Sequence, residues 1–418
     1  MAGLSRRNIL AAGAAGGALT ATAAAHAAGV FGNPDMPAEG RINVTNPKAL
    51  TDPGAQNPAM AAELPSFGNP PPTDVGTMPM VWSSFNTAPK RIQNGGWARQ
   101  ITTADFPVSV DISGVNMRLG PGGIRELHWH QQAEWSIMTY GQCRVTVVDE
   151  NGHAFVDDVK AGDLWYFPPG LPHSLQGLGP DGCEFVLCFD NGAASEDNTL
   201  LVTEWVAHTP PEVLAKNFGV PASAFQNIPV TQRWIFQGKE PGPLADDLKA
   251  VLPGAGTPPN PFTFHLSAMT PNQQNKSGMV QIADSTNFKA STTVAAAMVT
   301  VKPGGMRAMH WHPNADEWQY YIAGRARMTV FNTGPQAMTA DFKPGDIGYI
   351  KKNFGHYIEN TGSDDLVFLE VFKAARYAEV TLANWLAHTP VAMVRQTLNL
   401  SPETIARFAR GVEAIVPA

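Results

Sequence analysis

The chain has 418 residues, 44% of them apolar, which is enough for two domains with extensions and sizeable cores. Its formal net charge of −7 argues against a general nucleic-acid-binding protein, for which a basic surface is typical, so any anionic substrate must be held by local cations. Abundant glycine (39 residues) and proline (35 residues) favour many short strands and tight turns over long helices.

The first 27 residues are typical of an export signal. Ser5-Arg6-Arg7-Asn8-Ile9-Leu10 resembles a twin-arginine motif, an uncharged stretch rich in Ala and Gly follows over 9–25, and Ala25-His26-Ala27 fits a small-x-small cleavage site. A membrane anchor is the alternative, but the stretch is short and weakly apolar for a span, and no later segment is apolar enough to cross a bilayer. We therefore expect cleavage, no stable membrane insertion afterwards, and a periplasmic or secreted protein.

The chain repeats itself at a spacing of about 182 residues, after an arm over 28–95 that is rich in Pro, Asn and Gly. Residues 122–130 match 304–312, residues 141–147 match 324–330, and a Trp-x-Ala-His-Thr-Pro motif closes the copies at 205–210 and 385–390. So many matches in one register indicate a duplicated domain, with the first copy at 96–210 and the second at 281–390. We expect the arm to wrap these copies and not to form a third domain.

Each copy has the pattern of β structure. Short apolar or alternating runs, such as 144–148 and 164–167, are separated by Gly, Pro, Asn and Asp. Evenly spaced strands of this kind predict an all-β fold of two tandem jelly-roll barrels. Helical patterns occur only after each barrel: the segment 211–280 contains a helix and then a linker with a strand near 262–266, and residues 391–418 form a C-terminal helical extension.

The cysteines do not indicate a disulfide framework, because there are only three of them, an odd number: Cys143, Cys183 and Cys188. We expect all three to be small buried residues. Cys183 and Cys188 are five positions apart on one predicted strand, so their side chains should point to opposite faces.

Each copy carries three histidines and one glutamate at the spacing of metal ligands. Two histidines, two positions apart on a strand, face the same side; a glutamate follows four or five residues later, and a third histidine follows about 40 residues after that. The two sets are His128, His130, Glu134 and His173 in the first copy, and His310, His312, Glu317 and His356 in the second. A single His-x-His is often incidental, but six of the chain's eleven histidines fall in these matched sets, so we predict two metal sites per chain.

The ligand types limit the metal. The absence of thiolate excludes soft sites, and four protein ligands would close a tetrahedral zinc site without room for chemistry. Imidazole with carboxylate suits an octahedral Mn(II) or Fe(II) ion that keeps two adjacent positions open for substrate or dioxygen, and the residues do not separate these two metals. Export after folding fits loading inside the cell, because affinity alone would favour copper or zinc.

These motifs resemble the cupin superfamily. Residues 122–141 and 304–324 meet its first motif, whereas the second motif of the second copy has Lys351 and Asn353 where Pro and Gly are typical. After about residue 60 the chain resembles the bicupin oxalate decarboxylase family, for example at 366–372. This resemblance implies two cupin (double-stranded β-helix) barrels, manganese in both with the N-terminal site catalytic, cleavage of oxalate to formate and CO2 with a requirement for dioxygen, and a homo-oligomer, trimeric or hexameric.

The resemblance also implies roles for two residues of the first copy. Arg125 would be the charge partner of oxalate beside the metal, although strand alternation points it away from His128 unless the backbone is kinked. Glu196, in Ser195-Glu196-Asp197-Asn198-Thr199, would lie on a lid and give the proton that completes formate. The structural alternatives are a surface or interface ion pair for Arg125 and a solvated loop carboxylate for Glu196. The Asp197-Asn198 pair departs from the family's Ser-Glu-Asn-Ser/Thr lid.

In the second copy, Arg307 and Glu370 would play parallel roles. The segment after Glu370, residues 372–377, offers no acid for a lid, so we expect a structural site or an electron partner. Trp129 and Trp311 lie between ligand histidines and must face away from their own metals. We expect core packing for both, with an electron relay between sites as the alternative.

Two rival functions remain open from the sequence. One is an oxalate oxidase, which makes hydrogen peroxide, or another Mn/Fe bicupin dioxygenase; oxalate oxidases lack a proton donor on the lid, so Glu196 favours the decarboxylase. The other is a non-enzymatic bicupin storage or binding protein. Such proteins usually lack complete ligand sets, whereas both sets are complete here.

Overall fold

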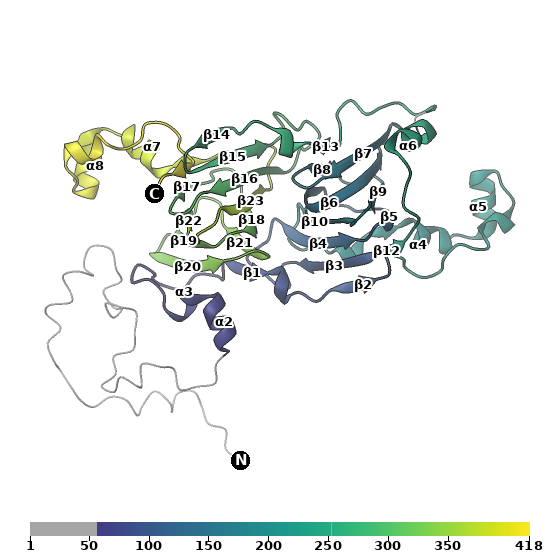
Figure 1. Cartoon of the computed structure of the whole chain (residues 1–418), viewed down its shortest axis with the longest axis horizontal. Helices are drawn as coiled ribbons and strands as arrows, with labels where there is room; N and C mark the ends of the chain where they lie inside the picture. Colours follow the sequence, from purple (N-terminus) through teal and green to yellow (C-terminus); the bar gives the residue numbers. More distant parts are fainter. Residues whose placement is uncertain (1–56, 252) are drawn as a thin grey trace, which may run out of the picture.

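The computed structural model describes residues 57–251 and 253–418, and it contains two β-barrels side by side (Figure 1). The N-terminal barrel is drawn in blue and the C-terminal barrel in green. Strands dominate and helices are short, as the frequent glycines and prolines predict. The all-β fold of two tandem barrels is thus confirmed, whereas the predicted export signal and residues 28–56 lie outside the described residues.

The N-terminal barrel is built on one sheet whose path is β11-β5-β9-β6-β10-β4-β3-β2, with β7, β8, β12 and β13 paired beside that path. Strand β6 (Glu134–Val148) closes the barrel, because its first part pairs with β8 and β10 and its second part with β7 and β9. Gly141 lies where the pairing partners of β6 change. Its φ of 72° favours glycine, and a Cβ at this position would clash with the Gly182 carbonyl. The other strands are β2 (Arg91–Gln93), β3 (Gly96–Ile101), β4 (Ser113–Leu119), β5 (Gly123–Trp129), β7 (Ala154–Lys160), β8 (Leu164–Phe167), β9 (His173–Gly177), β10 (Cys183–Phe189), β11 (Leu200–Leu201), β12 (Ile235–Gln237) and β13 (Thr263–Phe264).

The C-terminal barrel has two facing sheets, ordered β1-β21-β18-β23-β16-β15-β14 and β20-β19-β22-β17-β24, with β25 beside β17. The counterpart of β6 is divided here into β18 and β19 at Gly324. The strands are β1 (Trp82–Ser84), β14 (Gln273–Asn275), β15 (Gly278–Ala283), β16 (Ala295–Val301), β17 (Met306–Trp311), β18 (Glu317–Ala323), β19 (Ala326–Asn332), β20 (Gln336–Phe342), β21 (Asp346–Ile350), β22 (Gly355–Asn360), β23 (Leu366–Phe372), β24 (Val380–Thr381) and β25 (Ile415–Val416).

The chain crosses between the barrels in two places. Strand β1, which precedes the N-terminal barrel in sequence, pairs with β21 of the C-terminal barrel, and β2 then joins the N-terminal sheet. Strand β13 forms where a strand was predicted, but it pairs with β8 of the N-terminal barrel, and the chain enters the C-terminal sheet only at the next strand, β14. Segments from either side of the N-terminal repeat therefore connect the two barrels.

Short helices follow each barrel as predicted, but helices also precede the first barrel, so the expectation that they occur only after the barrels was wrong. The first helix begins because Asn57 caps Met60 N and a proline occupies its first turn. The helices are α2 (Pro58–Glu63), α3 (Pro65–Gly68), α4 (Val202–Ala207), α5 (Pro211–Phe218), α6 (Leu244–Val251), α7 (Leu382–Ala387), α8 (Val391–Leu398) and α9 (Pro402–Ile405), with short 3-10 turns at Phe85–Thr87, Glu196–Asn198, Ala222–Phe225 and Leu266–Ala268. None of the helices among the described residues combines the length and the apolar character needed to cross a membrane.

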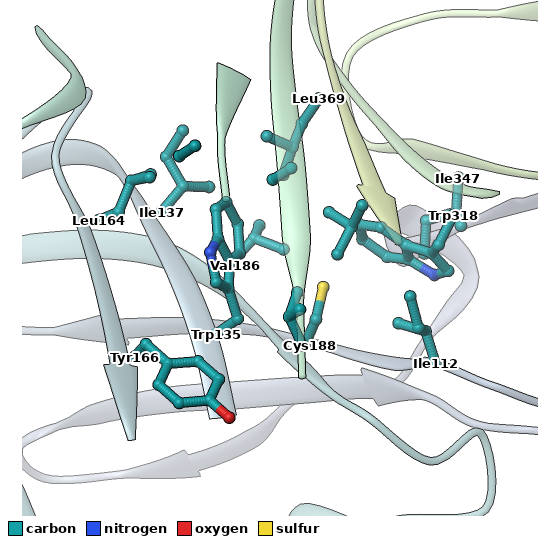
Figure 2. Packing of buried hydrophobic residues seen from close by; sticks show 14 of the residues in the cluster. Ile112, Trp135, Ile137, Leu164, Tyr166, Val186, Cys188, Trp318, Ile347 and Leu369 are labelled. Carbon is teal, nitrogen blue, oxygen red and sulfur yellow. The ribbon is translucent and has the colours of Figure 1, made fainter. Parts of the chain in front are cut away.

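Three main apolar clusters hold the molecule together: one inside each barrel and one between them. Figure 2 shows the cluster between the barrels, in which Trp135 of the first repeat and the matching Trp318 of the second are both buried. Cys183 packs inside the N-terminal barrel and Cys188 packs between the barrels, so the prediction that they point to opposite faces is confirmed. Both are buried free thiols, as is Cys143.

Candidate metal centres and active site

The N-terminal barrel brings its four predicted ligands together. His128 pairs directly with His173 across β5 and β9, and Glu134 opens β6, so three strands place their ends at one point. One ligand atom from each residue lies within 4.8 Å of the others, and all four side chains are buried. The Nδ1 atoms lie near backbone carbonyl oxygens, at 2.6 Å in His130 and 2.8 Å in His173, and donation there leaves the Nε2 lone pairs facing the centre.

The C-terminal barrel repeats this arrangement. Its four predicted ligands, His310, His312, Glu317 and His356, are buried, and one ligand atom from each lies within 4.8 Å of the others. Glu317 Oε2 lies 3.0 Å from His312 Nε2 and 2.9 Å from His356 Nε2.

The groups are suited to a cation. His173 Nε2 and His356 Nε2 are buried and have no hydrogen-bond partner, which is costly unless something else binds them. Burial lowers the pKa of His128 and of His173, which keeps both imidazoles neutral. Burial alone would raise the pKa of Glu134, but its contacts with His130 and His173 outweigh burial and lower that pKa. Neutral imidazole and ionised carboxylate are the forms that bind metal.

Side chains outside the ligand sets orient the glutamates. Trp165 Nε1 and Ser136 Oγ donate to Glu134 Oε1 at 2.9 and 3.2 Å, so Oε2 is the oxygen turned to the histidines. In the second barrel Gln319 Nε2 donates to Glu317 Oε1 at 2.7 Å. These three partners could not be predicted from the sequence, because they occupy ordinary strand positions and nothing in the local pattern indicates their hydrogen bonds.

Arg125 faces the metal side of its strand, because the strand is irregular here, which is the exception that the alternation argument allowed. The pairing of β5 with β9 shifts register between Arg125 and His128, and this irregularity turns both side chains inward. The guanidinium is fully buried; Nε lies 3.0 Å from Glu196 Oε1, and Nη1 donates to the Trp234 carbonyl at 3.2 Å. The same shift occurs between Arg307 and His310 in the second barrel.

Glu196 lies at the start of a 3-10 turn that covers the N-terminal group. The turn is capped by Ser195, whose Oγ accepts from Asp197 N, and the Glu196 carboxylate is only 4% exposed. Beneath it lies a small cavity of about 10 Å³, lined by Arg125, His128, Glu134 and Glu196 among others. Space on the scale of one water does not admit a dicarboxylate. A substrate therefore enters only when Glu196 moves.

The C-terminal site differs in the groups around its arginine. Arg307 Nε lies 3.0 Å from Glu370 Oε1, and Nη2 contacts Glu379 and the Tyr377 hydroxyl. The absence of an acid at 372–377 is correct, but Glu379, two residues further on, was missed. Little in the sequence indicates that Glu379 belongs to the site, because an acidic residue after a loop is usually solvated.

Comparison with known proteins agrees with this geometry. The sequence profile of the cupin family matches residues 83–224 and 264–406. Oxalate decarboxylase OxdC of Bacillus subtilis is 50% identical over 83% of this chain and 88% of its own length. The chain belongs to the oxalate decarboxylase family of cupins.

Further relatives extend this family assignment. A probable oxalate decarboxylase of Arthroderma benhamiae is 40% identical over 87% of this chain and 90% of its own length. A solved structure of the Bacillus subtilis enzyme, determined in a study of its Mn(II) centres, has a TM-score of 0.86 at 47% identity and covers 88% of this chain and 97% of that one. The expected fold and family are therefore confirmed, and the duplicated sites belong to a bicupin enzyme family.

Trp129 and Trp311 face away from their own ligand groups, but neither is in a core as we expected. Trp129 packs edge-to-face on Trp205, and Trp311 on Trp385, with ring centroids 5.6 and 5.7 Å apart. Trp205 and Trp385 are 66% and 54% exposed, so both pairs lie on the outer surface of their barrels. Strand alternation predicted the direction of these two side chains correctly, but it could not predict that the outer face of each barrel is largely uncovered there.

Proposed function

We propose that this chain decarboxylates oxalate to formate and CO2 at the N-terminal site, with manganese bound and dioxygen required. The observation that carries the proposal is the buried Arg125–Glu196 pair directly over the His3Glu group. It places one cation for an anionic substrate and one acid for proton transfer at the same cavity. The similarity to oxalate decarboxylases over most of the chain supports this choice of substrate.

The residues fit a divalent metal in each barrel. His128, His130, Glu134 and His173 would hold one ion, and the matching residues of the second barrel would hold another. A bound manganese ion would supply a positive, redox-active centre next to the substrate. The absence of cysteine from either group and the single carboxylate in each agree with this metal.

The chain's own residues then have definite tasks. Arg125 exchanges its contact with Glu196 for a carboxylate of oxalate, which fixes the substrate in the cavity. When the C–C bond breaks and CO2 leaves, the remaining carbon needs a proton to become formate, and protonated Glu196 gives it. The lid excludes bulk water while this happens. The reaction has no net gain or loss of electrons, because one carbon of oxalate is oxidised to CO2 while the other is reduced to formate. One proton from solvent ends on formate.

The C-terminal site is unsuited to an anionic substrate. Arg307 is already neutralised by Glu370 and Glu379, and all three are almost fully buried. Leu187 occupies the position in β10 that Glu370 occupies in β23, two residues before the phenylalanine that pairs with the ligand glutamate. The N-terminal cavity is therefore lined by an apolar side chain at the position where the second barrel has the Glu370 carboxylate. We propose a structural or electron-storing role for the second metal.

Product analysis separates this proposal from its main rival, an oxalate oxidase. The mature protein, expressed with manganese and assayed with oxalate under air, should release formate and CO2 in about equal amounts with little hydrogen peroxide. Hydrogen peroxide as the main product would establish the oxidase instead. If the protein bound two manganese ions per chain and did not turn over oxalate, both readings would be contradicted.

Export and oligomerisation remain proposals with separate support. The twin-arginine motif at 5–10 supports export to the periplasm or beyond, and cell fractionation with N-terminal sequencing tests cleavage after residue 27. Helices α5 and α8 project at opposite ends of the molecule (Figure 1) and expose Phe218 and Met393, respectively. Apolar side chains of this kind support a homo-oligomer, trimeric or hexameric, and light scattering would measure its mass.

A further inference from the structure

The lid over the N-terminal cavity is held from outside by a side chain that precedes the barrel. Arg91 begins β2, about a hundred residues before the lid in sequence. Its Nη2 contacts Glu196 Oε2 and its Nη1 lies 2.9 Å from Asp197 Oδ1. One guanidinium therefore binds both carboxylates of the lid, each through its own nitrogen.

Gln100 of β3 holds the same turn through a separate set of hydrogen bonds. Its Oε1 accepts from Glu196 N at 2.9 Å, and its Nε2 donates to Asp197 Oδ2 at 3.1 Å and to Ser195 Oγ at 3.0 Å. Asp197 is thus the residue at which both contacts meet, with one carboxylate oxygen on Arg91 and the other on Gln100. It is also one of the two positions, with Asn198, at which the lid departs from the family pattern.

The position of Arg91 is itself fixed. Its guanidinium lies over the Trp234 ring, 4.4 Å from the centroid, and the carbonyl of the same tryptophan accepts from Arg125. The two arginines therefore approach Glu196 from different sides, one in the cavity and one at the surface. An open cleft of about 350 Å³, lined by Lys90, Arg91 and Asp197 among others, lies on the outer side of these contacts.

We propose that Arg91 is a positioning residue which, through Asp197, keeps the lid closed during turnover and so sets the ratio of formate to hydrogen peroxide. This inference rests on the proposed decarboxylation. Glu196 loses its charge when it carries the proton, and its bond to Arg91 then weakens. Asp197 remains an anion at that moment, so Arg91 stays on the lid. A neutral residue at 197 would leave Arg91 without a charged partner just when the cavity must stay closed.

The competing reaction defines what an open lid would do. In it oxalate gives two electrons to dioxygen, both carbons leave as CO2, and dioxygen takes up two protons to become hydrogen peroxide. A lid that stays closed keeps Glu196 beside the carbon to be protonated and excludes solvent. A loosened lid therefore raises the peroxide fraction without touching a metal ligand.

The test compares three variants in the manganese-loaded full chain. Asp197→Asn removes the charge from an exposed position and should raise the peroxide-to-formate ratio about twofold to fivefold, the range for a partly exposed ion pair. Arg91→Gln removes both ion pairs and should raise it about tenfold or more. Arg233→Gln is the matched control, because Arg233 lies over Phe236 and forms no ion pair within residues 57–251 and 253–418. Its product ratio should equal that of the wild type.

Hydrogen exchange at residues 195–199 provides a second readout that does not depend on the reaction. Faster exchange of these amides in Arg91→Gln, but not in Arg233→Gln, is expected if Arg91 holds the lid. Unchanged exchange and an unchanged product ratio in both Asp197→Asn and Arg91→Gln would overturn the inference. If the wild type makes no formate, the proposed function fails, and the exchange experiment still decides whether Arg91 holds the lid.

Discussion

Replacing Glu196 with glutamine should abolish most formate production while leaving the fold and both metal sites in place. Glutamine has the same shape and keeps an oxygen beside Arg125 Nε, which lies 3.0 Å from Glu196 Oε1, but it cannot give up a proton to carbon. General acids contribute about 10²- to 10⁴-fold to rates. Formate turnover should therefore fall by at least about 100-fold, equivalent to roughly 2.7 kcal/mol of transition-state stabilisation.

The second barrel offers a matched control for this substitution. Glu379 contacts Arg307 beside the C-terminal group, as Glu196 contacts Arg125 beside the N-terminal one. Glu379→Gln should leave formate turnover within about threefold of the wild type, because we assign no proton transfer to that site. Formate, hydrogen peroxide and bound manganese would be measured for both variants. Formate production by Glu196→Gln within about threefold of the wild type, with manganese unchanged, would refute the assignment of the proton donor.

Three further predictions follow from the site and the core. Arg125→Gln removes the buried cation from the substrate cavity and should lower kcat/KM for oxalate about 10-fold to 100-fold, as measured by initial rates; an unchanged kcat/KM would contradict its role. Trp318→Ala opens a cavity between the barrels and should cost about 3–5 kcal/mol of stability in urea unfolding, whereas a loss below about 1 kcal/mol would show that this cluster contributes little. In the metal-free chain, burial lowers the pKa of His128, His173 and His310, so below about pH 6.5 the unfolded chain binds more protons than the folded one. The Tm of chelator-treated protein should therefore be highest above about pH 6.5 and fall as the pH decreases; a Tm that rises on acidification would contradict the neutral state of these histidines.

The ligand sets could be predicted from the sequence because strand alternation and the repeat act locally. His128 and His130 share a face of one strand, and the second copy shows the same spacing at His310 and His312. The barrels were predictable for the same reason, from short alternating runs between glycines and prolines. The features that depend on a few neighbouring residues, the ligand sets and the strands of the barrels, could thus be predicted from the sequence.

The remaining features depend on distant or irregular parts of the chain. The direction of Arg125 follows from a register shift against β9, and hydrophobic alternation carries no sign of such a shift. Arg91 reaches Glu196 across 105 sequence positions, and Glu379 returns to Arg307 across 72. The exposed position of Trp129 depends on what covers the outer face of the barrel, which no local pattern specifies.

The central claim is that oxalate reacts at the N-terminal metal group and not at its C-terminal copy. His173→Ala and His356→Ala remove equivalent ligands, one from each group. Each variant should lose about one manganese ion per chain, measured together with formate release from oxalate under air. We predict that formate release disappears in His173→Ala and persists in His356→Ala. The account would be contradicted if His173→Ala still released formate after losing the N-terminal manganese. It would also be contradicted if formate release were lost only in His356→Ala.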